Sequence, residues 1–285
     1  MQENHTETEL ISNEAPRVLI VIPTYNGSKF VSSTIQSCLD QSYKNIEIVV
    51  IDDCSIDDTV ESIKIFHDSI KVITSDVHMG LPKNLNRVIL NSNSKYFIAL
   101  GQDDLLERNH VIEMIKSFEN DVVAVHCNLQ KIDKDGKYIS IFYDDKSQMY
   151  RTKNLLRELS LRNFISIVGM MHRTSAFKLI SGCDESYDLY WEWLYYIKIS
   201  TLGRIKYNEN LKPKWRIHDT NASLTLYGLN RNWSFLVYKT RCRFLAYTKL
   251  YDLFHIPRFL IYFINDIRNH IIKIIRLFIK YLFTK

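Results

Sequence analysis

The sequence predicts an α/β fold in which helices flank a mostly parallel central sheet. Three observations predict it: short apolar segments alternate with helical segments over residues 17–127, the connections between them are a few residues long, and several apolar segments end in polar residues. Such alternation is typical of βαβ units with right-handed crossovers. With 285 residues, 46% of them apolar, the chain is long enough for one such domain and an appendage.

Five apolar segments are predicted to be strands. Residues 17–23 are a continuous run rich in β-branched residues and closed by proline, a pattern typical of a strand buried on both faces. The other predicted strands are 46–53, 70–74, 96–100 and 122–127.

Four segments between these strands have helical patterns. Residues 28–43 place apolar side chains at helical spacing. Residues 57–67 begin with acidic side chains, which the helix dipole favours, and residues 82–92 begin with Pro82, which suits the first helical position. The fourth helix is expected within residues 107–119.

Polar side chains follow three of the predicted strands, where a parallel sheet binds its ligands. These groups are Thr24, Tyr25 and Asn26; Asp52 and Asp53; and Gln102, Asp103 and Asp104. Adjacent carboxylates repel, so Asp103 and Asp104 need a metal ion, a helix N-terminus or water beside them. The chain has neither a GxGxxG nor a GxxxxGK[ST] loop, so side chains and a metal would have to hold any nucleotide.

Composition argues against a disulfide-linked, a secreted or a nucleic-acid-binding protein. The five scattered cysteines include no CxxC pair and are expected to be free thiols in a reducing compartment. The first residues lack the basic and apolar regions of a signal peptide, which predicts a cytoplasmic protein. No nucleic-acid partner is expected.

Four segments, 18–61, 80–89, 97–111 and 187–225, resemble in order and spacing the family 2 glycosyltransferases, which are inverting, nucleotide-sugar-dependent enzymes. The resemblance implies the GT-A fold, a Rossmann-like α/β fold, over residues 16–225. The expected organisation is therefore a flexible N-terminus (1–15), this domain, and a helical C-terminal region (226–285).

The resemblance assigns the nucleoside to the ends of the first two strands, at Pro23, Thr24, Tyr25, Asn26 and Asp53. Asp53 would accept a hydrogen bond from the base, and Tyr25 would offer a stacking face. Asp52 has two interpretations, a nucleoside contact or a cap for the segment after Cys54. Lys83 and Asn86 either face the nucleotide or are ordinary surface residues of an amphipathic helix.

Asp103 matches the metal-binding carboxylate of the family, and its hard oxygen suits Mn²⁺ or Mg²⁺. The sequence departs from the family pattern at Gly101 and Gln102, where acids are frequent; Gln102 would contact a ribose hydroxyl. Asp104 either supports the metal ligand without touching the metal itself or caps a helix that begins near Leu105.

The late segment "KWRIHDTNAS" resembles a family element that reaches the donor. It suggests Arg216 for the diphosphate and His218 for the metal or the diphosphate, with a structural histidine as the alternative.

The catalytic base of the family corresponds to Glu192, which follows Trp191 where the family has an acid. A carboxylate there would take the proton of the acceptor hydroxyl. Flanking tryptophans would exclude water and raise its pKa. Glu185 and Asp188 are rivals, and a solvated Glu192 beside core tryptophans is the structural alternative.

The C-terminal region is basic and apolar. From Lys239 to Lys285 there are ten lysines and arginines and two acids, a net charge of +8 in a chain of net charge +5. After Arg258, the polar residues Asn265, Asn269, Lys273, Arg276 and Lys280 recur every three or four positions in a largely apolar sequence. This pattern favours a helix lying on an anionic membrane surface over one that spans the membrane. The alternative is a helix packed on the catalytic domain or on a second copy, which leaves homo-oligomer formation open.

The sequence thus predicts an inverting glycosyltransferase that moves a sugar from a nucleoside diphosphate, UDP in the first instance, to a saccharide or lipid-linked saccharide. Synthesis of bacterial surface polysaccharide (capsule, O-antigen or lipopolysaccharide), at the inner face of the membrane, is the expected setting. The alternative is a nucleotide-sugar-binding protein with weak or no turnover, suggested by the missing acids. A sugar-nucleotide pyrophosphorylase would want a glycine-rich, basic loop after the first strand, which "PTYNGSK" is not.

Overall fold

A computed structural model describes residues 15–142, 155–159, 163–186, 191–221 and 238–242 of the chain. The chain divides into two compact units, one comprising residues 1–151 and 164–218 and the other residues 152–163 and 219–285. The first unit contains the two sheets of the structure. The described part of the second includes helix α6 (Leu155–Leu159).

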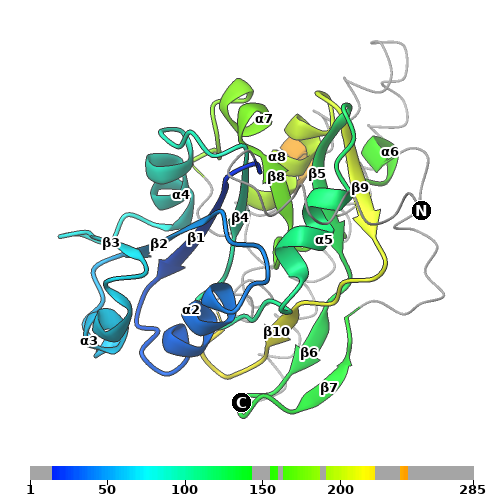
Figure 1. The fold of residues 1–285 in the computed structure, drawn as a ribbon. Coiled ribbons are helices and arrows are strands. Elements are labelled where there is room, and N and C mark those ends of the chain that lie inside the picture. Colours follow the sequence, from blue (N-terminus) through cyan, green and yellow to red (C-terminus); the bar gives the residue numbers. More distant parts are fainter. Residues whose placement is uncertain (1–14, 143–154, 160–162, 187–190, 222–237, 243–285) are drawn as a thin grey trace, which may run out of the picture. The chain divides into compact units, whose positions relative to one another are not determined.

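A seven-stranded sheet forms the centre of the first unit, in the order β3-β2-β1-β4-β8-β5-β9 (Figure 1). Its strands are β1 (Val18–Thr24), β2 (Ile46–Asp52), β3 (Lys71–Thr74), β4 (Tyr96–Ala99), β5 (Val122–Cys127), β8 (Met171–Arg173) and β9 (Arg204–Asn208). All the pairings are parallel except those of β8, which runs antiparallel to both neighbours. The mostly parallel sheet predicted from the sequence is confirmed.

Strand β1 lies in the middle of the parallel part, between β2 and β4. Its residues from Val18 to Ile22 are at most 1% exposed. Burial on both faces explains why the sequence of this strand is uniformly apolar rather than alternating.

The helices lie close to their predicted ranges. They are α2 (Val31–Leu39), α3 (Thr59–Ile63) with the short 3₁₀ helix η1 (Lys64–Phe66), α4 (Leu81–Ile89) and α5 (His110–Lys116). Two further helices, α7 (Thr174–Leu179) and α8 (Trp191–Ile199), follow β8. No described helix is long and apolar enough to pass through a bilayer. The predicted amphipathic helix after Arg258 lies outside the described residues.

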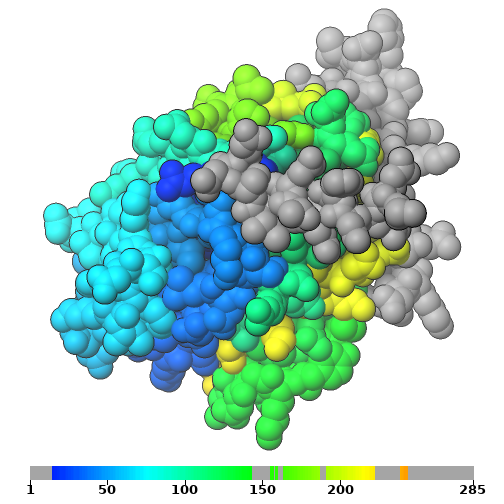
Figure 2. Space-filling model, viewed as in Figure 1, coloured from blue at the N-terminus to red at the C-terminus, as the bar shows by residue number. Residues whose placement is uncertain are grey.

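A small second sheet holds residues 214–216 beside the loop that follows β4 of the main sheet. It has the order β10-β6-β7, with β10 (Lys214–Arg216), β6 (Gln130–Ile132) and β7 (Tyr138–Ile141). Figure 2 shows yellow atoms of the late chain against the green atoms of the β6–β7 hairpin. Lys214 and Leu105 exchange two backbone hydrogen bonds of 3.0 and 2.9 Å, which fixes β10 beside the loop after β4. Arg216 and His218 are thereby placed next to Asp103.

Candidate active site

The carboxyl ends of β1 and β2 lie side by side because the strands are parallel and Thr24 is in register with Asp52. Asp52 is buried and accepts hydrogen bonds from the Thr24 hydroxyl (3.3 Å) and the Ser55 backbone N–H (3.1 Å). These contacts tie the turn after β2 to the end of β1. They favour the local, capping interpretation of Asp52 over a contact with a ligand.

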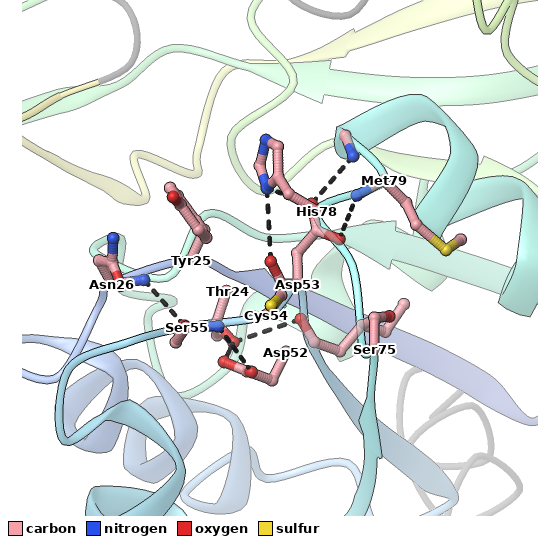
Figure 3. A network of polar contacts seen from close by, with 12 residues as sticks. Thr24, Tyr25, Asn26, Asp52, Asp53, Cys54, Ser55, Ser75, His78 and Met79 are labelled. Atoms are coloured by element: carbon pink, nitrogen blue, oxygen red, sulfur yellow. Dashed lines mark hydrogen bonds and ion pairs between the residues drawn. The ribbon is translucent and has the colours of Figure 1, made fainter.

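The Asp53 carboxylate is also buried, and it accepts hydrogen bonds from backbone N–H groups at the N-terminus of α4 (Figure 3). Its Oδ1 accepts the Met79 N–H (2.8 Å) and its Oδ2 the Gly80 N–H (2.9 Å). Gly80 caps the helix with a φ of 86°, a left-handed conformation that favours glycine. Burial raises the pKa of Asp53, but hydrogen bonds from Met79, Asn84 and Gly80 and the neighbouring His78 outweigh burial and lower it. Asp53 is therefore an ionised, well-satisfied carboxylate.

His78 completes this group, and sequence reasoning missed it. Its Nδ1 lies 2.9 Å from Asp53 Oδ2, and its ring centroid lies 4.4 Å from that of Tyr25 (Figure 3). Both rings are about half exposed. His78 lies in the loop between β3 and α4, where no periodic pattern marks a functional residue.

Gln102 connects the ends of β1 and β4. Its Oε1 accepts the Tyr25 N–H (2.8 Å), and its Nε2 donates to the Tyr25 carbonyl (3.1 Å). The predicted ribose contact of Gln102 would have to share these groups with Tyr25. Asn26 adopts a φ of 50°, and its Oδ1 accepts the Ile56 N–H (2.9 Å), so it shapes the turn between the strand ends.

The remaining predicted nucleoside residues have plainer environments. Pro23 lies within β1, in register with Ile51. Lys83 is exposed on the first turn of α4, three residues after the Gly80 cap. Its position next to the Asp53 group agrees with either of its two interpretations.

A second polar group follows β4. His218 Nε2 lies 2.8 Å from Asp103 Oδ2, and the side chains of His218 and Asp103 are 11% and 17% exposed. The Phe30 ring lies beneath, 4.6 Å from the His218 ring and 4.9 Å from the Arg216 guanidinium carbon. Asp103 and His218 are thus in direct contact, while the metal or diphosphate role predicted for His218 stays a prediction.

Arg216 is buried and holds this group together. Its Nε donates to the Asp103 carbonyl (3.0 Å), one Nη donates to the Lys134 carbonyl (3.1 Å), and its backbone N–H donates to Asp104 Oδ1 (3.2 Å). These contacts give Arg216 a positioning role. The diphosphate contact predicted for it stays a prediction.

Asp104 is buried directly behind Asp103. Burial and then the charge of Asp103 raise its pKa well above the usual range, partly offset by Arg216. A Cβ at Gly101 would lie 2.7 Å from Asp104 Oδ2 and 3.0 Å from Asp103 Oδ1. The adjacent carboxylates therefore occupy part of the space that a side chain at Gly101 would need.

The donor set around Asp103 is suited to a divalent cation that also binds substrate oxygens. Among the described residues, no three His, Cys, Asp or Glu side chains surround a common metal position. His218 Nε2 and Asp103 Oδ2 nevertheless lie 2.8 Å apart, a separation that two ligands of one ion can have, and the negative charge of Asp103 disfavours ionisation of Asp104. Two protein ligands leave coordination positions for phosphate oxygens and water, the arrangement usual for Mg²⁺ at nucleotides.

Glu192 lies in the first turn of α8, half-buried between the buried Trp191 and Trp193. Burial raises its pKa to about 7. The direction is the one expected from the flanking tryptophans, and the value is well suited to a general base at neutral pH. Of the rivals, Glu185 is exposed, and Asp188 lies outside the described residues.

Asn86 anchors the loop that precedes this helix. Its Nδ2 donates to the Cys183 carbonyl (2.9 Å) and to Glu185 Oε1 (2.8 Å), and its Oδ1 accepts the Cys183 N–H (2.8 Å). The charge of Glu192 contributes to the raised pKa of Cys183, so the anchored loop lies close to Glu192. Asn86 thus connects α4, which binds Asp53 at its N-terminus, to the approach to α8.

Comparison with known proteins identifies the family of this chain. Residues 19–180 match the family described as Glycosyl transferase family 2. The chain belongs to this family. It is 31% identical over 222 residues to an uncharacterized glycosyltransferase of Rickettsia typhi, covering 74% of this chain and 67% of that protein. It is 26% identical over 227 residues to the chondroitin synthase of Escherichia coli, covering 78% of this chain and 32% of that protein.

Solved structures show the same fold. TarS 1–349 of S. aureus in complex with UDP-GlcNAc superposes with a TM-score of 0.65 at 15% identity, over 88% of this chain and 72% of that one. The mannosyltransferase PcManGT of Pyrobaculum calidifontis, in complex with GDP-Man and Mn²⁺, gives a TM-score of 0.57 at 14% identity, over 84% and 75%. The GT-A fold and the glycosyltransferase activity predicted from the sequence are confirmed.

Proposed function

We propose that this glycosyltransferase transfers a sugar from a UDP-sugar to a hydroxyl of a saccharide or lipid-linked saccharide, with inversion, in the synthesis of a bacterial surface polysaccharide such as capsule, O-antigen or lipopolysaccharide. The observation that carries the proposal is the meeting of the Tyr25–Asp53 group and the Asp103–His218 pair at the carboxyl ends of neighbouring parallel strands. The UDP-GlcNAc bound by TarS and the polysaccharide named by the relative chondroitin synthase support it.

Two groups of residues would bind different parts of the sugar donor. The Tyr25–Asp53 group, with the turn of Thr24 and Asn26, would hold the nucleoside. Asp103 and His218 would hold Mn²⁺ or Mg²⁺, which when bound neutralises charge that accumulates on the leaving diphosphate. Arg216 and Asp104 position these two ligands from behind.

Glu192 would act as the general base. Its carboxylate takes the proton of the acceptor hydroxyl while that oxygen forms a bond to C1 of the sugar and the bond from C1 to the phosphate oxygen breaks. A single displacement of this kind inverts the configuration at C1. The buried tryptophans beside Glu192 limit access of water, which would otherwise compete with the acceptor.

The basic, apolar C-terminal region supports a location at the cytoplasmic membrane surface, where lipid-linked acceptors are found. Its sequence combines a net charge of +8 with phenylalanine, isoleucine and leucine, the composition of interfacial helices. Self-association through the same region is the competing use of this surface.

The test is the release of nucleoside diphosphate from a panel of UDP- and GDP-sugars, with Mn²⁺ or with a chelator. We expect release from at least one UDP-sugar, dependent on the metal. Asp103→Asn should keep the fold, as measured by thermal melting, and lose the gain in UDP affinity that Mn²⁺ gives the wild-type protein. Equal UDP affinity with and without Mn²⁺ in the wild-type protein would contradict the metal site.

The anomeric configuration of the product, read by NMR, tests inversion separately. Specific UDP binding without release from any sugar donor would favour the binding protein without turnover.

A further inference from the structure

The contacts of His78 match those that the proposed function gives to a nucleobase. A base is expected to donate an N–H to Asp53 and to stack on Tyr25. In the structure, the His78 imidazole lies 2.9 Å from Asp53 Oδ2 and 4.4 Å, centroid to centroid, from the Tyr25 ring (Figure 3). A planar heteroaromatic ring of this chain thus meets the carboxylate and the aromatic face together.

The proton on the ring is assigned by its neighbours. His78 Nδ1 lies near two acceptors, Asp53 Oδ2 and the Asp53 backbone carbonyl at 3.3 Å. Neither of these atoms can donate, so Nδ1 carries a hydrogen and donates it. The imidazole therefore presents a ring N–H to Asp53, the same group that uracil presents at N3.

A base and the His78 ring cannot use these contacts at the same time. A ring inserted between two others needs about 7 Å between their planes, because each stacked pair is about 3.5 Å apart. The Tyr25 and His78 centroids are 4.4 Å apart and the ring planes are tilted by 45°, so there is no room for a base between the two rings. The Asp53 side chain is only 6% exposed, and its oxygens already accept the Met79 and Gly80 N–H groups.

The backbone around His78 is held at both sides, so a rotation of the side chain is the movement available. Ser75 N–H donates to the Asp52 carbonyl (2.9 Å), and Met79 and Gly80 donate to Asp53. The side chain itself is 53% exposed and can turn toward solvent without disturbing these bonds.

We infer that His78 is an internal placeholder for the nucleobase, which an incoming uridine nucleotide displaces, and that it thereby sets nucleotide affinity. This inference rests on the proposed function, since it uses the same nucleoside site. Asp53 keeps its two backbone partners throughout, so the exchange replaces one ring N–H at Asp53 and one ring contact with Tyr25 by those of the base. The placeholder lowers the apparent affinity by the fraction of time for which it holds the position.

The decisive experiment is calorimetric titration of the wild-type, His78→Ala and His78→Phe proteins with UMP and with UDP plus Mn²⁺. We expect His78→Ala to bind both nucleotides more tightly, by about tenfold if His78 holds the position nine-tenths of the time. The factor should be similar for UMP and UDP, because His78 contacts the nucleoside side only. His78→Phe keeps a ring beside Tyr25 but has no N–H, so it should give a smaller gain in nucleotide affinity. If the alanine variant folds poorly, the affinity of this variant tests the inference instead.

His67→Ala is the matched control. His67 is an exposed histidine that precedes the amino end of β3, whereas His78 follows the carboxyl end of the same strand, so the loss of His67 should leave both affinities unchanged. In protein labelled with ¹⁵N-histidine, UMP should shift the ring signals of His78 and not those of His67.

Unchanged or weaker binding by His78→Ala would overturn the inference, and weaker binding would instead make His78 a direct base contact. If the wild-type protein releases UDP from a sugar donor while the variant shows no gain, this inference alone fails. If neither protein binds UMP or UDP, the proposed function fails with it.

Discussion

Two carboxylates, Asp53 and Glu192, have pKa values displaced in opposite directions, and their neighbours explain the difference. Burial acts on both. For Asp53, the effect of burial is outweighed by the Met79 and Gly80 backbone N–H groups, the Asn84 side chain and the neighbouring His78. These favour the ionised form and lower the pKa of Asp53. The pKa of Glu192 is raised to about 7 by burial. The first environment suits a fixed anion that binds, and the second suits a group that takes up and releases a proton.

Replacement of Glu192 by Gln should remove the general base and keep the shape of the side chain. We expect donor binding to be retained and transfer to fall by about 10²–10⁴-fold. Glu185→Gln, which changes a nearby exposed carboxylate, is the control and should retain most of the activity. Near-normal transfer by Glu192→Gln, measured under saturating donor, would move the base to another residue.

The same substitution tests the raised pKa without any substrate. Glu192 has an ordinary pKa of 4.5 and a pKa of about 7 in the folded protein, so folding takes up a proton between these values. Stability contributed by the protonated form is therefore lost as the pH rises through this window. Gln cannot ionise, so the melting temperature of Glu192→Gln relative to wild type should increase from pH 5 to pH 8, about the span of this window. A difference that does not vary with pH would show that Glu192 is solvated.

At the scale of elements, Asn86 connects the helix that supports Asp53 with the segment leading to Glu192. It satisfies both the N–H and the carbonyl of Cys183, which is itself buried, and it reaches Glu185. The two halves of the site are therefore joined by side-chain hydrogen bonds across 97 positions of sequence. The sequence predicts either a nucleotide contact or a surface position for Asn86, whereas in the structure its side chain is buried and bonded to Cys183 and Glu185.

Asn86→Ala should destabilise the protein and disturb the geometry at Glu192. Each buried backbone group of Cys183 that loses its partner costs about 1–3 kcal/mol, which lowers the melting temperature by several degrees. We expect kcat to fall more than UDP affinity, because α8 is disturbed while the Asp53 contacts remain. Asn91→Ala is the control. Asn91 is exposed just after the end of the same helix, and its side chain donates a hydrogen bond to the Arg87 carbonyl within that helix. Equal melting temperatures for Asn86→Ala and wild type would contradict the role of this anchor.

How far the sequence predicted these elements depends on how local their signals are. The strands up to Cys127 were predicted to within one residue at each end, and the helices to within four. Each of these strands is a short, largely apolar run and each helix has its own apolar period, so both signals are local. Strand β8 was not predicted: it has three residues, and its place between β4 and β5 is decided by pairing with residues far away in sequence. His78 and the anchoring role of Asn86 were missed for the same reason, since both depend on tertiary contacts, whereas Asp53 and Asp103 were marked by their positions at strand ends.

At the scale of the whole molecule, charge is divided unevenly along the chain. The segment from Lys239 to Lys285 carries +8, and the remainder of the chain carries −3. The site at the strand ends is built from acidic and neutral side chains, apart from Arg216 and the histidines. The candidate site for the sugar donor and the basic segment therefore lie in different parts of the sequence, and the basic segment is suited to an anionic partner.

We predict that this basic segment binds anionic membrane surfaces. Apolar side chains such as Phe259, Ile264, Ile271 and Phe278 would enter the headgroup boundary, and each lysine or arginine near the surface would add about 1 kcal/mol, screened by salt. Full-length protein should sediment with liposomes that contain anionic lipid, less so in high salt, and poorly with neutral ones. A protein truncated after Tyr251 should remain in solution in every case.

A full-length variant with Lys273, Arg276 and Lys280 changed to Gln separates charge from apolar burial. It should lose the preference for anionic lipid and keep its melting temperature, because the apolar side chains are intact. A helix packed inside the protein or against a second copy predicts another pattern: truncation would unfold or dissociate the enzyme, and the charge variant would bind liposomes no differently from wild type. Because a surface-bound enzyme meets lipid-linked acceptors at high local concentration, truncation should also lower transfer to a membrane-embedded acceptor while leaving donor hydrolysis unchanged.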